Sequence, residues 1–204
     1  MALTFVVSTD LTFLLLTHGA GSNRNAPLLV AVADAFHAAN VEVLRSDLSF
    51  RRERPHGPPR SGDAARDREG LREEILKIRE KKPDRVWLGG HSYGGRQSSI
   101  LAAEAPGLVD ALLLLSYPLH PPRKPAELRT AHFPQLRTPA LFVHGSRDPF
   151  ASTVELSDAI AQIRAHVNLL EIEGAGHDLG RNHAALAAEI AATFLGDARL
   201  LGTT

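Results

Sequence analysis

The chain has 204 residues, carries 23 basic and 23 acidic side chains, and contains no cysteine. Because the formal net charge is zero, no global field recruits nucleic acid or an anionic membrane. The missing thiols exclude disulfides, thiolate metal sites and a cysteine nucleophile. This length is enough for one domain with a substantial core and short for two, so we expect a single domain over residues 1–204.

The amino-terminal part of the chain is strongly apolar, which raises the question of a signal peptide. No Lys or Arg precedes its apolar part, and Asp10 interrupts the run, so we expect two strands there, Thr4–Val7 and Thr12–Thr17. No uninterrupted apolar stretch approaches the ~18 residues that a membrane helix needs. We therefore expect a cytoplasmic protein that binds neither membranes nor nucleic acid.

The rest of the chain alternates between apolar, strand-like runs and segments of helical period. Further strands are predicted at 41–44, 86–88, 108–115, 140–143 and 167–172. Helices are predicted at 27–39, at 63–81, from the turn after the 86–88 strand to Pro106, at 152–164 and at 183–195. Residues 49–62 and 116–125 are predicted as loops, and a short tail follows residue 195. This alternation is typical of an α/β protein with a mostly parallel sheet and helices on both faces.

The sequence around Ser92 is the most informative part of the chain. Gly90, Ser92 and Gly94 form the pattern G-x-S-x-G between a predicted strand and a predicted helix, the context of a nucleophile elbow. A serine on so sharp a turn is held in a strained conformation with its hydroxyl projecting outward. The alternative is a glycine-rich turn that contains a serine by chance; the flanking strand and helix favour the elbow.

Two further loops that follow strands carry the residues that a serine nucleophile needs. The chain order Ser92, Asp148, His177 is that of the α/β-hydrolases, and loops at the carboxyl ends of parallel strands meet at one edge. His177 would take the serine proton, and Asp148 would orient the imidazole. The alternatives are an ordinary loop histidine and an Asp-Pro turn. Asp178 is a rival acid, but the side chain of an adjacent residue points elsewhere.

Acyl transfer also requires N–H donors for the oxyanion that forms. The backbone N–H of Tyr93 is one candidate, and the loop after the second strand supplies another, from Ala20 or Gly21. Because these donors belong to the main chain, side-chain identity matters less than backbone freedom. His18, at the start of the same loop, is predicted to be structural.

Four segments, HGAGSNRNAPLL, GGHSYGGRQSS, VHGSRDPF and GAGHDL, together resemble the small, lid-less α/β-hydrolases related to dienelactone hydrolases. The testis-expressed and nonspecific-lethal-subunit hydrolase-like branch is most similar, because it shares an F-x-x-R-R…P-P loop like Phe50–Pro59. The resemblance runs from Leu14 to Leu195 and implies an α/β-hydrolase fold of eight-strand type or a reduced form of it. It places the nucleophile, acid, base and oxyanion roles on Ser92, Asp148, His177, Ala20 and Tyr93. Dienelactone hydrolase itself has a cysteine nucleophile, so dienelactone is not the expected substrate.

Candidate substrate contacts are Gly21 and three arginines: Arg51 and Arg52 in the 49–62 loop, and Arg96 after the elbow. Arginine binds carboxylate and phosphate through paired hydrogen bonds. The alternative, which we favour for these arginines, is a solvated surface loop or structural ion pairs with acidic neighbours. The stretch between the predicted strands 108–115 and 140–143 is too short for a large helical lid. An open site and small substrates are therefore expected.

The predicted function is a serine hydrolase that cleaves a small carboxylic ester or thioester through an acyl-serine intermediate, without metal or cofactor. No H-E-x-x-H or comparable histidine spacing indicates a metal site. Two alternatives remain open: a binding or scaffold module that uses the hydrolase fold without catalysis, and a peptidase or amidase with the same triad. The sequence does not indicate the substrate or the oligomeric state.

Overall fold

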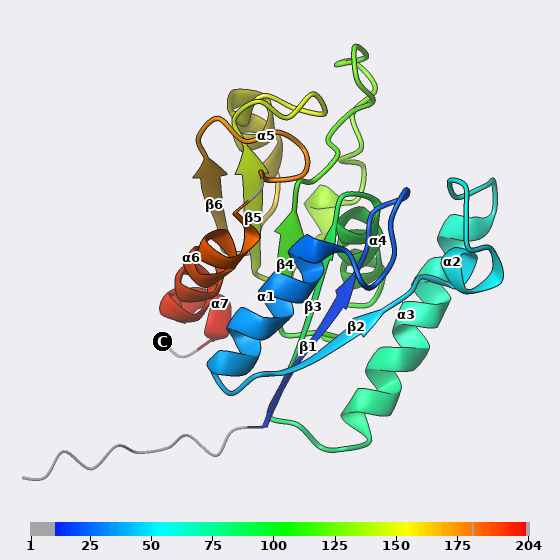
Figure 1. Cartoon of the computed structure of the whole chain (residues 1–204), viewed down its shortest axis with the longest axis vertical. Helices are drawn as coiled ribbons and strands as arrows, with labels where there is room; N and C mark the ends of the chain where they lie inside the picture. The colour runs from blue at the N-terminus through cyan, green and yellow to red at the C-terminus, as the bar shows by residue number, and fades with distance from the viewer. Residues whose placement is uncertain (1–10, 181, 203–204) are drawn as a thin grey trace, which may run out of the picture.

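A parallel sheet forms the centre of the computed structural model, which describes residues 11–180 and 182–202 (Figure 1). Within these residues the sheet has six strands in the order β2-β1-β3-β4-β5-β6, and every neighbouring pair is parallel. The strands are β1 (Thr12–Thr17), β2 (Glu42–Ser46), β3 (Arg85–His91), β4 (Ala111–Leu115), β5 (Ala140–Gly145) and β6 (Val167–Ile172). The predicted strand at residues 4–7 lies outside the described part of the chain.

Helices cover both faces of the sheet, as predicted. One face is covered by α1 (Pro27–Ala38), α6 (His183–Gly196) and α7 (Ala198–Leu201). The other face is covered by α3 (Asp63–Arg79), α4 (Tyr93–Glu104) and α5 (Thr153–Ile160). The short helix α2 (Ser49–Glu53) lies beside α3 (Figure 1). Among the described residues, no helix is both long and apolar enough to cross a membrane.

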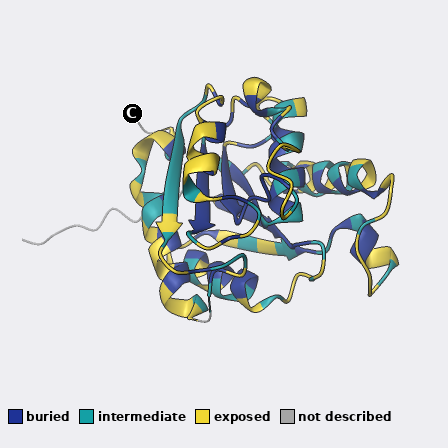
Figure 2. Ribbon diagram, turned by 90° about the horizontal axis from the view of Figure 1, so that it is seen from above, coloured by how far each residue is buried: buried dark blue, intermediate teal, exposed yellow. Residues whose placement is uncertain are grey.

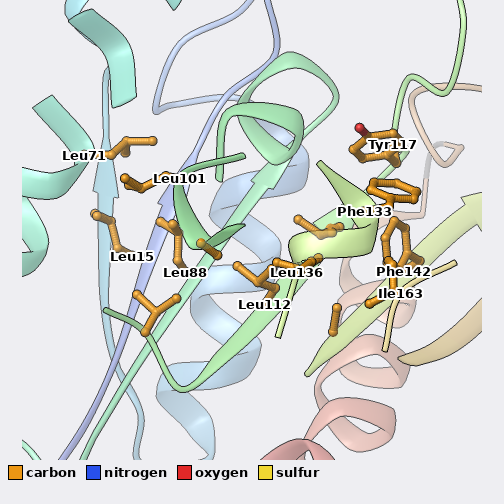
Figure 3. Packing of buried hydrophobic residues seen from close by; sticks show 14 of the residues in the cluster. Leu15, Leu71, Leu88, Leu101, Leu112, Tyr117, Phe133, Leu136, Phe142 and Ile163 are labelled. Carbon is orange, nitrogen blue, oxygen red and sulfur yellow. The ribbon is translucent and has the colours of Figure 1, made fainter. Parts of the chain in front are cut away.

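The strands separate two hydrophobic cores, and β4 shows how. Side chains alternate between the two faces of a strand, so Leu112 and Leu114 pack into the core under α3 to α5. Leu113 and Leu115 pack into the core under α1 and α6. All four are fully buried, and burial of one leucine stabilises the fold by about 1.5–3 kcal/mol. Figure 2 shows the buried centre of the sheet in dark blue, and Figure 3 shows Leu112 in the first of these cores.

Two elements differ in kind from the prediction, and several boundaries shift. The 49–62 segment, predicted as a loop, begins with α2, because Phe50 is buried and its N–H donates to the carboxylate of Asp67 on α3 (2.9 Å). The predicted tail contains α7, where the Asp197 side chain accepts from the N–H of Arg199 (3.1 Å) and Leu200 is buried. The first helix, α2, depends on long-range packing, and α7 depends on a cap that lies beyond the end of the predicted helix. The hydrophobic periodicity of the sequence shows neither feature.

The segment between β4 and β5, where many hydrolases insert a lid, remains short and irregular. Residues 116–139 contain only one 3₁₀ turn, η1 (Phe133–Gln135). No helical cap therefore rises from this position over the carboxyl edge of the sheet, in agreement with the sequence-based expectation.

Candidate active site

Ser92 lies on a strained turn between β3 and α4. Its backbone angles are φ 52° and ψ −116°, in a region that L-residues rarely adopt. The turn is possible because the strand and helix approach very closely: a Cβ at Gly90 would lie 2.7 Å from the carbonyl carbon of Gly94. The backbone N–H of Ser92 donates to the carbonyl of Leu115 (2.8 Å), which fixes the turn to the end of β4. The predicted nucleophile elbow has the expected geometry.

The side chains of Ser92, His177 and Asp148 form a continuous hydrogen-bonded chain. The distance from Ser92 Oγ to His177 Nε2 is 2.8 Å, and that from His177 Nδ1 to Asp148 Oδ2 is also 2.8 Å. In the neutral ring, Nδ1–H donates to the carboxylate and Nε2 accepts from the hydroxyl. The Asp148 carboxylate is fully buried, whereas 24% of the His177 side chain is exposed. This arrangement can remove a proton from the serine and return it from an accessible imidazole.

Phe150 holds both the acid and the base in place. Its N–H donates to Asp148 Oδ1 (2.9 Å), which leaves Oδ2 for the imidazole of His177. Its ring stacks on that of His177, with centroids 4.3 Å apart and planes tilted by 33°. The residue follows the Asp-Pro pair directly, but nothing in the sequence indicated its contact with His177.

His91, immediately before the nucleophile, supports the loop that carries the base. Its Nε2–H donates to the backbone carbonyl of His177 (2.8 Å), and the two rings lie 5.2 Å apart. Burial lowers the pKa of His91, so the ring is neutral near pH 7. Sequence analysis did not single out this residue, since nothing in the local pattern indicates that it reaches 86 positions along the chain.

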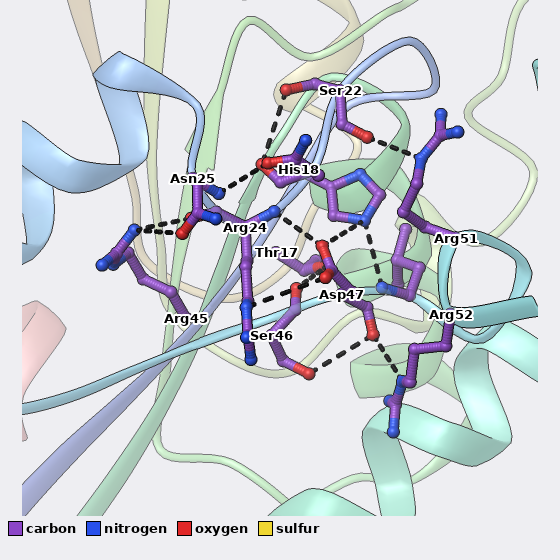
Figure 4. A network of polar contacts seen from close by, with 12 residues as sticks. Thr17, His18, Ser22, Arg24, Asn25, Arg45, Ser46, Asp47, Arg51 and Arg52 are labelled. Atoms are coloured by element: carbon purple, nitrogen blue, oxygen red, sulfur yellow. Dashed lines mark hydrogen bonds and ion pairs between the residues drawn. The ribbon is translucent and has the colours of Figure 1, made fainter. Parts of the chain in front are cut away.

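The loop after β1 lies directly against the elbow, where an oxyanion donor is needed. A Cβ at Gly19 would lie 3.5 Å from the Cβ of Ser92. His18 fixes this loop: its Nδ1–H donates to the carbonyl of Gly19 (2.8 Å), and its Nε2 accepts from the N–H of Leu48 (3.1 Å) (Figure 4). Burial lowers the pKa of His18, and the ring is neutral, so its 3.5 Å approach to Asp47 is not an ion pair. His18 is structural, as predicted.

Arg51 also holds the loop after β1, and this corrects its expected role. The residue is 7% exposed, and its guanidinium donates to the carbonyls of Ala20 (2.8 Å) and Ser22 (2.8 Å). It also donates to three carbonyls within residues 54–57. In a trans peptide C=O and N–H point in opposite directions, so the Gly21 N–H points away from Arg51. The guanidinium is used by the fold and is not available to a substrate.

Arg52 is likewise occupied by the fold. Its Nη2 pairs with Glu74 on α3 (2.6 Å), and its Nε donates to the carbonyl of Asp47 (2.8 Å) (Figure 4). The expectation of a substrate contact is therefore replaced by a structural role for this residue too. The favoured alternative, a structural ion pair, is correct for Arg52. Arg51 is instead buried and bonded to main-chain carbonyls, which neither expectation described.

Tyr93 is anchored by its side chain as well as by the helix that it begins. Its hydroxyl donates to Oδ2 of Asp67 (2.7 Å), the same carboxylate that accepts from the N–H of Phe50. Burial is the largest cause that raises the pKa of both Tyr93 and Asp67, and the tyrosine stays protonated at neutral pH. Side-chain identity therefore matters at this position, in contrast to the expectation from its backbone role.

The main-chain N–H of Tyr93 directly follows the nucleophile at the start of α4, and that of Ala20 belongs to the loop that lies against the elbow. Among hydrogen bonds between described residues, neither group donates to a protein acceptor. Gly21 is exposed, and a Cβ there would meet no atom within 4 Å, so its loop faces open space. Arg96 lies one helical turn after the nucleophile, with its N–H donating to the carbonyl of Ser92 (2.9 Å).

Comparison with known proteins gives one family and several solved structures. Residues 10–190 match the family model described as an alpha/beta hydrolase domain. The dienelactone hydrolase of Anabaena variabilis is 24% identical, with a TM-score of 0.71 over 93% of this chain and 88% of that chain. Est1E of Butyrivibrio proteoclasticus is 16% identical (TM-score 0.73; 92% and 88% covered). A lid-less α/β serine hydrolase of Xanthomonas campestris is 16% identical (TM-score 0.68; 90% and 81% covered). At these identities the likeness to the solved structures shows the fold alone.

Proposed function

The chain belongs to the α/β-hydrolase family, and on this premise we propose that it is a serine hydrolase that cleaves small carboxylic esters or thioesters. The proposal rests on two successive contacts of 2.8 Å, from Ser92 to His177 and from His177 to Asp148. A serine hydroxyl is a poor nucleophile at neutral pH and requires such a base, itself oriented by a third group.

In the first half-reaction, Ser92 Oγ attacks the carbonyl carbon of the substrate while its proton passes to Nε2 of His177. The buried carboxylate of Asp148 stabilises the imidazolium that results. The carbonyl oxygen becomes an oxyanion, for which we assign the N–H groups of Ala20 and Tyr93 as donors. When the tetrahedral intermediate collapses, the bond to the leaving group breaks, and Nε2–H protonates that group. An acyl-serine remains.

In the second half-reaction, water replaces the alcohol or thiol. His177 Nε2 removes a proton from the water as the water oxygen attacks the acyl carbon, and the same two N–H groups donate to the oxyanion that forms. Collapse of this intermediate breaks the bond to Ser92 Oγ, which regains its proton from the imidazole. The products are a free carboxylic acid and the resting enzyme, and no other group is consumed.

The finer parts of the proposal rest on other features. An irregular 116–139 segment in place of a helical lid favours small acyl groups. Absence of cysteine suits a cytoplasmic location, which we propose together with a single domain. The Phe50–Pro59 loop supports a place in the testis-expressed and nonspecific-lethal-subunit branch. Gly21 remains a proposed substrate contact.

Covalent labelling tests the proposal. Folded wild-type protein should react with a fluorophosphonate to give one adduct per chain, on the peptide that contains Ser92. The Ser92→Ala variant, with its fold verified by circular dichroism, should give none. If the folded wild type fails to react, the chain is a binding or scaffold module instead. Aryl esters, thioesters and aminoacyl amides of equal acyl length then rank the substrate classes, and a preference for amides would contradict the esterase assignment.

A further inference from the structure

Two arginines from different parts of the chain act on each other electrostatically, and one of them follows the proposed nucleophile by one helical turn. Arg96 belongs to the first turns of α4, and its N–H donates to the carbonyl of Ser92 (2.9 Å). Arg129 belongs to the segment that follows β4, where its N–H donates to the carbonyl of Leu119 (2.8 Å) and its Nη1 to that of Pro118 (3.3 Å). Both side chains are half-buried.

Tyr117 connects the two arginines. Its hydroxyl donates to the carbonyl of Arg129 (2.6 Å) and also lies against the guanidinium of Arg96. The Tyr117 ring itself is fully buried against Phe133 and Phe142, so it forms a rigid floor (Figure 3). The N–H of Ser92 donates to the carbonyl of Leu115 at the end of β4, and Tyr117 follows Leu115 by two residues.

Neither arginine has a carboxylate partner among residues 11–180 and 182–202. Other half-buried or exposed arginines of the same face do have one: the pairs are Arg52–Glu74, Arg54–Asp63, Arg66–Glu53, Arg68–Glu104 and Arg79–Asp110. Within the same part of the chain, the Nε of Arg96 is buried and has no hydrogen-bond partner. An enclosed donor of a charged group without an acceptor is costly. Arg96 is only half-buried, so the remaining N–H groups of its guanidinium can reach an acceptor from outside the chain.

One acidic neighbour acts on this pair: Glu127 raises the pKa of Arg129, but its carboxylate is paired with Lys124 (2.8 Å). Burial lowers the pKa of Arg129, and the positive charge of Arg96 lowers it further. The pKa of His132 is lowered to about 4, by burial first and then by Arg96 and Arg68, so this imidazole is neutral near pH 7. Its Nε2–H donates to Ser99 Oγ (2.8 Å), whose own proton goes to the Arg96 carbonyl (2.9 Å). The two guanidinium groups thus act on each other without a direct carboxylate partner, and Arg96 lies one helical turn after Ser92.

We propose that Arg96 and Arg129 form a subsite for an anionic group of the substrate, either a carboxylate or a phosphate. Two guanidinium groups bind such a group through paired hydrogen bonds, which gives both affinity and orientation. The proposal rests on the proposed function and makes it narrower: the preferred substrates are small esters or thioesters that carry a second, anionic group. The enzyme would thus distinguish a dicarboxylic monoester from a neutral ester of equal length.

Kinetics with two matched esters test this specificity. Mono-4-nitrophenyl glutarate has a free carboxylate, and its methyl ester has the same length without the charge. Wild-type kcat/KM should be higher for the charged ester. Arg96→Gln and Arg129→Gln should each lower the ratio of the two values by about tenfold or more, while hydrolysis of the neutral ester is retained. Arg123→Gln removes an equal charge from an exposed position of the same segment and should leave the ratio unchanged.

Binding to the Ser92→Ala variant gives a second readout that needs no catalysis. Glutarate and inorganic phosphate are titrated separately by calorimetry, and the same titrations are repeated after Arg96→Gln or Arg129→Gln is added. If glutarate or phosphate binds to Ser92→Ala and this binding is lost in both double variants, the subsite is supported. The anion with the lower Kd then identifies the anionic group of the substrate. Absence of binding, or an unchanged ester ratio in folded variants, overturns it. If fluorophosphonate labelling fails but anion binding persists, the proposed function is wrong and the subsite stands.

Discussion

Replacement of Arg51 by methionine tests how the loop after β1 is held in position. The guanidinium donates five hydrogen bonds to carbonyl oxygens, of Ala20, Ser22, Arg54, Pro55 and Gly57. Hydrogen bonds from a charged donor contribute about 1.5–3 kcal/mol each. The last two acceptors lie in exposed residues and regain water, whereas those of the loop after β1 are half-buried. We therefore expect a loss of about 2–4 kcal/mol, since water also solvates the unfolded arginine.

For a chain of this size 1 kcal/mol corresponds to about 2–4 °C, so Arg51→Met should lower Tm by about 5–15 °C in a calorimetric scan. Because the peptides that follow Gly19 lose one of their anchors, fluorophosphonate labelling of the folded variant should also slow by about 10–100-fold. That is less than the effect of a lost oxyanion donor. The matched control is Arg52→Met, the next residue, which is exposed and donates two hydrogen bonds in place of five, so its loss of stability should be smaller. Equal losses of Tm in the two variants, or an unchanged labelling rate in Arg51→Met, would refute this reasoning.

Three further substitutions test other contacts. Tyr93→Phe leaves a buried oxygen of Asp67 without its donor, and should cost about 1–3 kcal/mol in urea unfolding at pH 7 while fluorophosphonate labelling persists, because the main-chain N–H remains. Asp148→Asn should reduce kcat by about 10³–10⁴-fold with little change in stability, since the imidazole of His177 is then held in the wrong tautomer; ester hydrolysis measures it. Asp63→Asn should lower Tm at pH 7, because hydrogen bonds from the Arg60 N–H and from two arginine side chains depress the pKa of this carboxylate. A depressed pKa stabilises the fold above the ordinary value of about 4 and does so less as the pH falls below it, so the Tm difference should narrow in acid.

Each of these outcomes has a clear opposite. Labelling abolished in Tyr93→Phe would show that its hydroxyl, and not its backbone, serves the reaction. Full activity in Asp148→Asn would remove the acid from the mechanism. A difference in Tm that stays constant down to pH 3 would show that the Asp63 variant is destabilised by packing and not by the loss of a charge.

The sequence predicted the fold and the triad for physical reasons that are visible at individual residues. The run Thr12–Thr17 has the bounds of β1, since central strands of a parallel sheet are apolar throughout. The predicted strand Val167–Ile172 likewise has the bounds of β6, which lies at the edge of the sheet. Ser92, Asp148 and His177 each follow a strand, and a parallel sheet brings such positions to one edge.

What the sequence did not predict is the set of contacts between distant segments. Nothing near Arg51 indicates that its guanidinium reaches the loop after β1, 29 and 31 positions away. In the same way Asp67 reads as one more charged residue of an amphipathic helix, although it accepts from α2 and from Tyr93. The support of His177 by His91 is likewise a long-range contact. Such residues are polar and unpatterned in sequence, and only the packed fold gives them a partner.

The most direct test of the mechanism is to trap the acyl-enzyme. Wild-type protein mixed with 4-nitrophenyl acetate, or with the ester that it hydrolyses fastest, is quenched in acid within the first turnover and digested for mass spectrometry. We predict one acyl group on the oxygen of Ser92, formed in a burst with released nitrophenol and absent in Ser92→Ala. Turnover of the ester without that acyl group, or with it on another residue alone, would contradict the mechanism.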